Sequence, residues 1–302
     1  MTTVSFFDGL SGGQIALTQL GIIPKKYYAA EIKPHAIKVT KANFPNTIHI
    51  GDVRKVFYKD GILKTENGVF EVGKIDLLIG GSPCQDLSCM NSNQIGLAGE
   101  KSSLFWEFAR IKKESSPTHF LLENVGSMPY NDAITISNEM GVEGIRINSA
   151  LVSAQQRDRI YWTNIPGDCV DLFGNKKISQ PIDRKISATS ILESGYTDRE
   201  KMLCITARSG KRWGNLFTNE RYKRQETQLK LKKRYEKAFE NIVFEDGYVR
   251  PLTIKEMERL QTVPEGYMKN LDWVKACDLL GDGWTIEVIK HIFKNLPQNV
   301  SL

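Results

Sequence analysis

A cysteine and a glutamate each follow an apolar run in this sequence, where they could act together on one substrate. Cys84 stands directly behind Pro83 in GGSPCQDLS, and Glu123 closes the run THFLLE. Two arginines, Arg157 and Arg159, lie two residues apart in QQRDRIYW. A free thiol is mostly protonated at neutral pH, so a nearby cation favours its reaction as a nucleophile. The set predicts a thiol that attacks a ring beside a carboxyl group that protonates or hydrogen-bonds a ring nitrogen.

Two other interpretations of Cys84 have to be weighed, namely a core residue and a metal ligand. Most lone cysteines are structural. The five cysteines, at positions 84, 89, 169, 204 and 277, form no C-x-x-C pair, and there are only four histidines. This pattern argues against a zinc site and against a disulfide framework, so we expect no metal. The strand-end position, the glutamate and the arginine pair favour the nucleophile.

The elements that must position these residues alternate between two periodicities. Short apolar runs predict strands at 3–7, 26–31, 47–52, 74–81, 118–123 and 159–165, and helical patterns lie between several of them, at 14–21, 34–44, 103–113 and 131–141. This alternation predicts an α/β fold with a doubly wound, mostly parallel sheet. Ligands of such sheets bind at the carboxyl ends of the strands.

Three consecutive strand ends could bind a nucleoside. The first leads into the glycine-rich turn FFDGLSGG, the second ends at Glu31 and the third at Asp52. The turn allows a close backbone approach, Glu31 can accept from ribose hydroxyls and Asp52 from an adenine amino group. Three ordinary polar strand ends are the alternative. The pattern G-x-G-x-x-G, which is typical of pyrophosphate binding, is absent, so we expect a nucleoside that carries another group. S-adenosylmethionine (AdoMet) is therefore the expected cofactor.

Composition indicates a soluble protein with two domains. The chain has 302 residues, of which 41% are hydrophobic and 25% charged; this length predicts one large domain and a smaller one. The start MTTVSFFDG does not resemble a signal peptide, and no run approaches a membrane span. We therefore expect a cytoplasmic protein without a membrane partner.

Basic residues gather in the weakly patterned middle of the chain. Between positions 199 and 237 there are 13 Lys and Arg against 4 Asp and Glu, an excess of +9 in a chain whose net charge is +6. Such an excess is typical of a surface that binds a polyanion. It is equally typical of the solvated face of a helix, because Leu231, Tyr235, Phe239 and Ile242 would form one apolar stripe.

Taken in order, several motifs resemble those of the DNA (cytosine-5)-methyltransferases: FFDGLSGG, GGSPCQDLS, LLENVGSM, QQRDRIYW and RPLTIKEMERLQTVPEGY. The resemblance covers roughly residues 1–165 and 249–302. It implies a catalytic AdoMet-binding domain of residues 1–166, completed by 272–302, and a small target-recognition domain of residues 167–271. The partner implied is double-stranded DNA methylated at a specific short sequence, and we expect a monomer.

Carried onto this sequence, the resemblance makes Cys84 the nucleophile that adds to C6 of cytosine and Glu123 the group that holds and protonates N3. Arg159 is then expected to contact O2 of a base flipped out of the duplex, Arg157 to support the cysteine and a phosphate, and Gln155 to line the same site.

The resemblance also implies cofactor and DNA contacts. The cofactor residues expected are Phe7, Leu10, Gly12, Glu31, Ile32, Asp52, Val53, Pro83, Leu104, Asp282 and Gly283. Residues 85–103 are expected to form a lid over DNA, with contacts from Gln85 and Ser88. The loop TARSGKRWGN could contact phosphates and a guanine edge through Arg208, Lys211, Arg212, Trp213 and Asn215, although a basic loop without this role fits the sequence as well.

One departure and two rival functions follow from the same resemblance. The family commonly has Gly-Asn before the final helix, whereas LGDGWT has Asp282 in the Asn place. A tRNA cytosine methyltransferase of similar ancestry is one rival, but its usual Pro-Pro-Cys and Cys-Phe-Thr signatures are absent. An inactive DNA-binding homologue is the other, and retention of both Cys84 and Glu123 argues against it.

Overall fold

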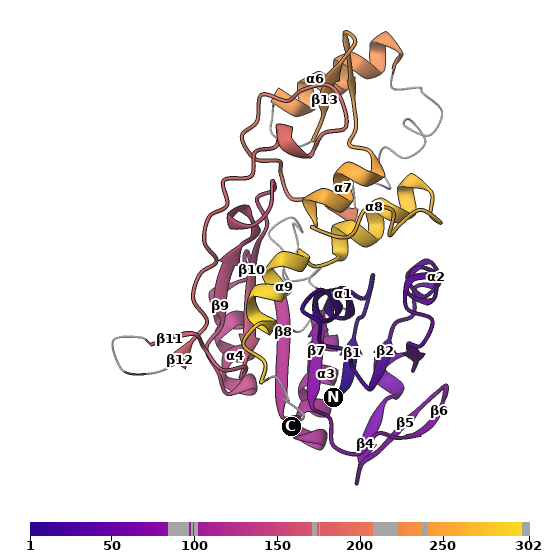
Figure 1. Cartoon of the computed structure of the whole chain (residues 1–302), viewed down its shortest axis with the longest axis vertical. Coiled ribbons are helices and arrows are strands. Elements are labelled where there is room, and N and C mark those ends of the chain that lie inside the picture. Colours follow the sequence, from indigo (N-terminus) through magenta and orange to yellow (C-terminus); the bar gives the residue numbers. More distant parts are fainter. Residues whose placement is uncertain are drawn as a thin grey trace. The chain divides into compact units, whose positions relative to one another are not determined.

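A computed structural model of the chain describes residues 1–83, 97, 99, 102–170, 174, 176–207, 223–236 and 241–297. The chain forms two compact units (Figure 1). Unit 1 comprises Met1–Ile147, Asp158–Gln180 and Ile289–Leu302, and unit 2 comprises Asn148–Arg157 and Pro181–Val288. No helix in the described part of the chain is long and apolar enough to cross a membrane.

Unit 1 is built on a seven-stranded sheet with the order β3-β2-β1-β7-β8-β10-β9. The pairs from β3 to β8 are parallel, and β10 runs antiparallel to β8. The strands are β1 (Thr2–Phe6), β2 (Lys26–Ala30), β3 (Ile48–His49), β7 (Leu77–Gly81), β8 (His119–Val125), β9 (Ile145–Asn148) and β10 (Asp158–Thr163). The six strands expected from the sequence are all present, and β9 is an addition at the edge.

Helices cover both faces of this sheet, as neighbouring residues of β7 show. A Cβ added to Gly13 in α1 (Gly12–Gln19) would lie 2.2 Å from Cδ1 of Ile79. A Cβ added to Gly80 would lie 2.9 Å from Phe108 of α3 (Phe105–Ser115). Successive strand residues point to opposite faces, so α1 and α3 lie on opposite sides. Two further helices of unit 1 are α2 (Pro34–Asn43) and α4 (Tyr130–Met140).

A three-stranded antiparallel sheet, which was not predicted from the sequence, is inserted between β3 and β7. It consists of β4 (Phe57–Lys59), β5 (Ile62–Thr65) and β6 (Gly68–Glu71). Glu66, in its second turn, accepts from the backbone N–H of Asp52 at 2.7 Å and pairs with Lys55 at 2.6 Å. The insertion therefore holds the turn that follows β3. A short hairpin, β11 (Cys169–Val170) with β12 (Lys176–Lys177), also belongs to unit 1.

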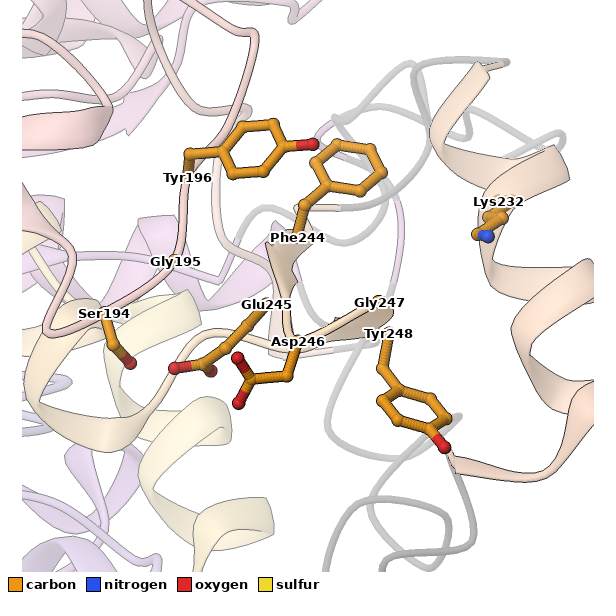
Figure 2. Close-up of a pocket in the computed structure, with 9 residues that line it drawn as sticks. All are labelled: Ser194, Gly195, Tyr196, Lys232, Phe244, Glu245, Asp246, Gly247 and Tyr248. Carbon is orange, nitrogen blue, oxygen red and sulfur yellow. The ribbon is translucent and has the colours of Figure 1, made fainter.

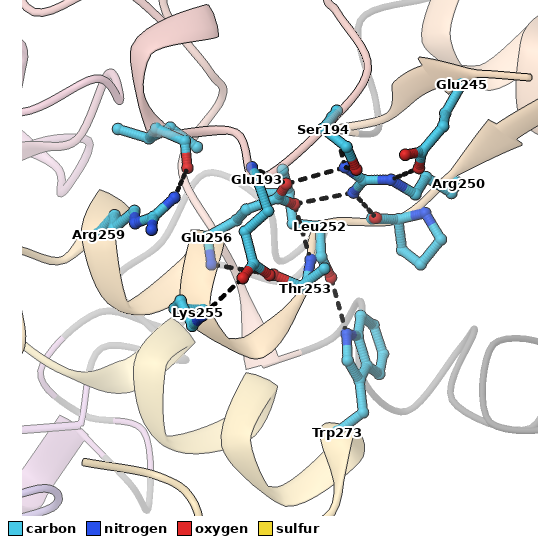
Figure 3. Close-up of polar contacts among 12 residues, drawn as sticks. Glu193, Ser194, Glu245, Arg250, Leu252, Thr253, Lys255, Glu256, Arg259 and Trp273 are labelled. Carbon is cyan, nitrogen blue, oxygen red and sulfur yellow. Dashed lines mark hydrogen bonds and ion pairs between the residues drawn. The ribbon is translucent and has the colours of Figure 1, made fainter. Parts of the chain in front are cut away.

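Unit 2 contains α6 (Gln225–Glu236), the hairpin β13 (Val243–Glu245) and β14 (Tyr248–Arg250), α7 (Ile254–Leu260) and α8 (Trp273–Asp282). Its polar anchor is the ion pair between Arg250 and the fully buried Glu256, at 2.9 Å (Figure 3). Arg250 also donates to the carbonyl of Ser194 at 2.7 Å. Glu256 forms a capping box with Thr253 at the start of α7, so one cluster joins the hairpin, a loop and a helix.

The helix that carries many of the basic residues ends earlier than the sequence suggests. Ile242 lies outside α6 and is buried next to β13, so its place in the predicted apolar stripe was wrong. The preceding residue, Asn241, exchanges two hydrogen bonds of 2.8 Å with the backbone of Leu203. These bonds hold the chain in a non-helical conformation before the hairpin. Leu231 is buried as expected, and Phe239 lies outside the described residues.

The two units are divided differently from the domains expected from the sequence. Residues 148–157, α8 and the first residues of α9 (Ile286–Phe293) belong to unit 2, and residues 167–180 belong to unit 1. Within this unit, Gln155 donates to the carbonyl of Leu260 at 2.9 Å, and Arg157 donates to that of Gly283 at 2.7 Å. The division of the chain into two units therefore depends on contacts between segments about a hundred residues apart. The hydrophobic periodicity of the sequence does not predict such contacts.

Candidate active site

The turn between β1 and α1 has a backbone that most residues avoid. Phe7, Gly9 and Ser11 have φ values of 56°, 56° and 62°, which is the left-handed region. Such conformations at non-glycine residues cluster at ligand-binding sites. Phe7 is partly buried, whereas Leu10 and Gly12 are buried. The turn brings the N-terminus of α1 to the carboxyl end of β1, as the glycine pattern predicted.

Glu31 is fixed at the end of β2 by three backbone N–H groups. Gly9 donates to Oε2 at 2.8 Å, and Ile32 and Lys33 each donate to Oε1 at 2.8 Å. An ionised carboxylate has about four acceptor positions, so a ligand hydroxyl can still be accepted without displacing these bonds. Ile32, the next residue, is 63% exposed and offers an apolar surface beside the carboxylate.

Asp52 begins the 3₁₀ turn Val53–Lys55 and is paired with Arg54. The guanidinium Nη2 lies 2.5 Å from Oδ2 of Asp52, and the Arg54 backbone N–H donates to Oδ1 at 3.0 Å. These hydrogen bonds hold the pKa of Asp52 below its usual range. The predicted contact of Asp52 with an adenine amino group stays a prediction, and such a donor would have to share the carboxylate with Arg54. The N–H of Val53 opens the turn and has no partner inside it, so it can bind the adenine edge.

Asp8, in the turn after β1, is a buried acid that the sequence reading did not single out. Its Oδ1 accepts from the hydroxyl of Tyr27 at 2.8 Å, and its Oδ2 is buried without a hydrogen-bond partner. Burial raises the pKa of Asp8 to about 6. The pKa of Tyr27 is also raised, by burial and then by the charge of Asp8. The available signal was an acidic residue directly after a buried strand.

Glu123 and Arg159 meet at the ends of adjacent strands. Nε of Arg159 lies 2.8 Å from Oε1 of Glu123, and both side chains are largely buried. In the register of β8 and β10, Tyr161 stands opposite Glu123 and Arg159 opposite Val125. Because β10 is antiparallel, its first residues lie at the carboxyl end of β8. The structure thus brings together the predicted acid and one of the two predicted arginines.

The end of β7 is tied to β8 through a side chain next to this acid. Asn124 donates from Nδ2 to the carbonyl oxygen and to Oγ of Ser82, at 3.2 and 3.1 Å. Its Oδ1 accepts from the N–H of Val125 at 2.7 Å. The bonds hold the chain just before Pro83 against the strand that carries Glu123. Cys84, Gln85 and Ser88 and most of the expected lid lie outside the described residues.

Arg157 and Gln155 make their contacts inside unit 2. Arg157 is 3% exposed and donates to the carbonyls of Ile205, Gly281 and Gly283 at 3.2, 3.0 and 2.7 Å. Gln155 is fully buried and, besides its bond to the Leu260 carbonyl, accepts from the N–H of Ile205. Arg157 precedes β10, which begins at Asp158, so the two arginines do not share a strand. The predicted contacts of Arg157 and Gln155 with a substrate stay predictions.

The remaining expected cofactor residues are spread over both units. Leu104 is partly buried against the core of unit 1, as is Phe7. Asp282 is the exposed last residue of α8, and Gly283 follows it in unit 2. The carbonyls on either side of Asp282 bind Arg157, so this arginine fixes the LGDG turn.

Unit 2 has a hollow of about 540 Å³ beside the β13–β14 hairpin (Figure 2). Tyr196 and Phe244 stack there with ring centroids 5.3 Å apart. Glu245, Asp246 and Lys232 also line the hollow, and this mixed charge does not favour a phosphate backbone. The residues expected to contact DNA, namely Arg208, Lys211, Arg212, Trp213 and Asn215, lie outside the described residues. Among the described residues, no cluster of His, Cys, Asp and Glu could hold a metal ion.

Solved structures with the same fold include methyltransferases from distant organisms. The Entamoeba histolytica methyltransferase EhMeth aligns with a TM-score of 0.63 at 13% identity, over 97% of this chain and 96% of that one. The Schizosaccharomyces pombe Dnmt2 methyltransferase aligns with a TM-score of 0.61 at 15% identity, over all of both chains. Fold and strand-end site define a Rossmann-like methyltransferase of the AdoMet-dependent class.

The family follows from the sequence as a whole. The family model described as C-5 cytosine-specific DNA methylase matches residues 1–169 and 172–298, and the chain belongs to this family. The type II methyltransferase M1.ScrFI of Lactococcus lactis subsp. cremoris is 27% identical over 97% of this chain and 77% of the relative. The type II methyltransferase M.NlaIV of Neisseria lactamica is 30% identical over 46% of this chain and 31% of the relative.

Proposed function

We propose that this protein transfers a methyl group from AdoMet to C5 of a cytosine in double-stranded DNA, within a specific short sequence. The observation that carries the proposal is the buried pair of Glu123 and Arg159 at the end of β8. It lies beside the end of β7, which Asn124 binds and from which the chain continues to Cys84. Family membership supplies the reaction type.

The chemistry begins with Cys84 and Glu123. The thiolate of Cys84 adds to C6 of cytosine while Glu123 donates a proton to N3, so that C5 becomes an electron-rich enamine carbon. Bound AdoMet would supply an electrophilic methyl group to C5, with S-adenosylhomocysteine as the leaving group. Loss of the C5 proton to a base and breakage of the bond between C6 and the Cys84 sulfur restore the aromatic ring. N3 returns its proton to Glu123 as the thiolate of Cys84 leaves, so the enzyme returns to its starting state.

Arg159 has two tasks in this scheme. Its Nε hydrogen bond orients the carboxyl group of Glu123. The guanidinium has further N–H groups, one of which donates to O2 of the same cytosine. A cation at O2 stabilises the electron density that develops in the ring when the thiolate adds.

The cofactor fits the strand ends of unit 1. Glu31 accepts from a ribose hydroxyl, the Val53 N–H and Asp52 bind the adenine edge, and Phe7 and Ile32 give it apolar surface. The buried Oδ2 of Asp8, which has no partner, calls for a ligand that donates a hydrogen bond. Pro83, Leu10, Leu104 and Gly12 complete the surroundings in this proposal, and the expected contacts of Asp282 and Gly283 stay predictions.

DNA is favoured over tRNA as the substrate. The family model that matches this chain is described as C-5 cytosine-specific DNA methylase, and the type II methyltransferase M1.ScrFI matches along 97% of the chain. C5 of a paired cytosine is inaccessible in a duplex, so the base has to be flipped out. The expected protein is a monomer that closes residues 85–103 over the DNA.

The experiment is methyl transfer from tritiated AdoMet to duplex DNA or to tRNA. Cys84→Ala removes the proposed nucleophile, and Cys169→Ala, at an exposed cysteine of unit 1, is the matched control. We expect label in DNA with the wild type and with Cys169→Ala, and none with Cys84→Ala. Label confined to tRNA, or no label in either nucleic acid, contradicts the proposal. Bisulfite sequencing of the labelled DNA then identifies the methylated site.

A further inference from the structure

Asp8 is held in a place where its negative charge has no counterion. It is 8% exposed and lies between Phe7 and Gly9, whose left-handed backbone fixes the turn. Tyr27 satisfies Oδ1, and Oδ2 is buried without a hydrogen-bond partner. A buried carboxylate oxygen without a partner is costly. Such a group in a ligand-binding turn points to a partner supplied by the ligand.

The groups that face Asp8 do not neutralise it. They are the hydroxyls of Ser5, Ser11 and Tyr27 and the carboxylate of Glu31. The hydroxyls favour the ionised form, but burial opposes it more strongly and the charge of Glu31 adds to that effect, so the pKa of Asp8 rises to about 6. Among the described residues, no Lys, Arg or His pairs with Asp8. A cation that donates a hydrogen bond would satisfy Oδ2 and also balance the charge of Asp8.

We propose that Asp8 binds the α-ammonium group of AdoMet through Oδ2, and that cofactor binding thereby releases a proton from the enzyme. This inference rests on the proposed function. AdoMet carries two cationic centres, but the sulfonium has no N–H or O–H to donate, so only the ammonium can satisfy Oδ2. A bound cation favours the charged carboxylate, and an Asp8 that was partly protonated in the free enzyme loses its proton.

The start of α1 suits the other charge of the same amino acid group. Its first turn has no acidic residue, and Ser11 makes no side-chain cap. The helix N-terminus, which begins at Ser11 and Gly12, carries a partial positive charge. This charge can attract the α-carboxylate of AdoMet. Asp8 and α1 thus present opposite charges to a zwitterion.

Two quantities are expected from this linkage. At pH 6 about half of the free enzyme carries the proton, so AdoMet binding releases about half a proton per site. The affinity for AdoMet is about tenfold weaker at pH 5 than at pH 7, because protonated Asp8 cannot accept from the ammonium.

Isothermal titration calorimetry of the whole chain measures both quantities, in buffers of different ionisation enthalpy at each pH. The variants are Asp8→Asn and Tyr27→Phe; the second removes the other hydrogen bond of Asp8 and leaves its carboxylate. The ligands are AdoMet, S-adenosylhomocysteine, which lacks the sulfonium charge, and 5′-methylthioadenosine, which lacks the amino acid group.

We expect Asp8→Asn to lower the affinity for AdoMet and for S-adenosylhomocysteine roughly ten- to a hundredfold and to abolish proton release. The affinity for 5′-methylthioadenosine should not change, and this result would also show that the pocket of the variant is folded. Tyr27→Phe should keep proton release. An equal loss for all three ligands, or a wild type that binds AdoMet without releasing a proton, overturns the inference alone. A wild type that binds none of the three overturns the proposed function as well.

Discussion

Nε of Arg159 lies 2.8 Å from Oε1 of Glu123, and the two side chains are 14% and 10% exposed. The pair joins two strands that run in opposite directions. It places a cation and an acid at the same edge of the sheet. Because both side chains are mostly out of water, the contact between them fixes the orientation of both.

We expect Glu123→Gln to lower the kcat/KM of methyl transfer at least a hundredfold, because an amide cannot supply the proton to N3. Arg159→Lys should retain more activity than Arg159→Ala, since lysine keeps the charge but loses the fixed guanidinium geometry. Arg146→Ala is the matched control: it removes an exposed ion pair with Asp158 in the same unit, and activity should be unchanged. Equal activity of Glu123→Gln and wild type would refute the role of the acid.

Asp8→Asn should stabilise the cofactor-free protein at neutral pH. The pKa of Asp8 is raised in the folded state to about 6 from 3.8, so the folded state pays for ionising it as the pH rises from 4 to 6. The difference of about 2 pKa units corresponds to roughly 3 kcal/mol. Urea unfolding of both proteins from pH 4 to pH 8 checks this. The variant's advantage should grow from pH 4 to about pH 6 and level off above it, and a difference that is constant from pH 4 to pH 8 would contradict the assigned burial.

Glu256→Gln should lower the unfolding free energy by about 1.5–3 kcal/mol, because it removes the buried carboxylate that accepts two hydrogen bonds from Arg250 and leaves that guanidinium only its ion pair with the less buried Glu245. The exposed pair of Lys255 and Glu193 supplies the control, since Lys255→Ala should cost about 1 kcal/mol or less. Denaturant unfolding measures both losses of unfolding free energy. Tryptophan fluorescence can follow it, because Trp273 donates to the carbonyl of Leu252 next to this cluster. Similar losses in the two variants would show that Arg250 does not anchor unit 2.

Gly13→Ala should displace α1 from the sheet, because the new methyl group would lie 2.2 Å from Cδ1 of Ile79. Overpacking of this kind costs about 1–3 kcal/mol, and AdoMet affinity should fall with it. Ile79→Val removes Cδ1 and should restore much of both losses in the double variant. Thermal unfolding and calorimetry measure them. If Ile79→Val restores neither stability nor AdoMet affinity, the losses in Gly13→Ala come from the backbone of the turn instead.

Asp282→Asn should leave methyl transfer intact or raise it. Asp282 ends α8, where a negative charge opposes the helix dipole, and asparagine supplies the amide donor that the family commonly has at this place. Steady-state kinetics with varied AdoMet concentration test this. A large loss of kcat/KM would instead give the carboxylate a role of its own.

Much of the fold and part of the site could be predicted from the sequence, because both depend on local patterns. Apolar runs located six strands of the main sheet, and the rule that parallel strands end at one edge selected Glu31, Asp52 and Glu123. The β4–β6 insertion was missed, since its short strands have little periodicity. So was the burial of Asp8, which depends on how α1 and β2 pack around it.

The partners of the two arginines were decided by tertiary structure alone. They lie two residues apart in the sequence, yet Arg159 binds Glu123 in unit 1, whereas Arg157 binds the carbonyl of Gly281, 124 residues away in unit 2. A chain can place a residue at the end of a strand through local preferences of its backbone. Which group then meets its side chain depends on contacts between distant segments, and these form only when the whole chain has folded.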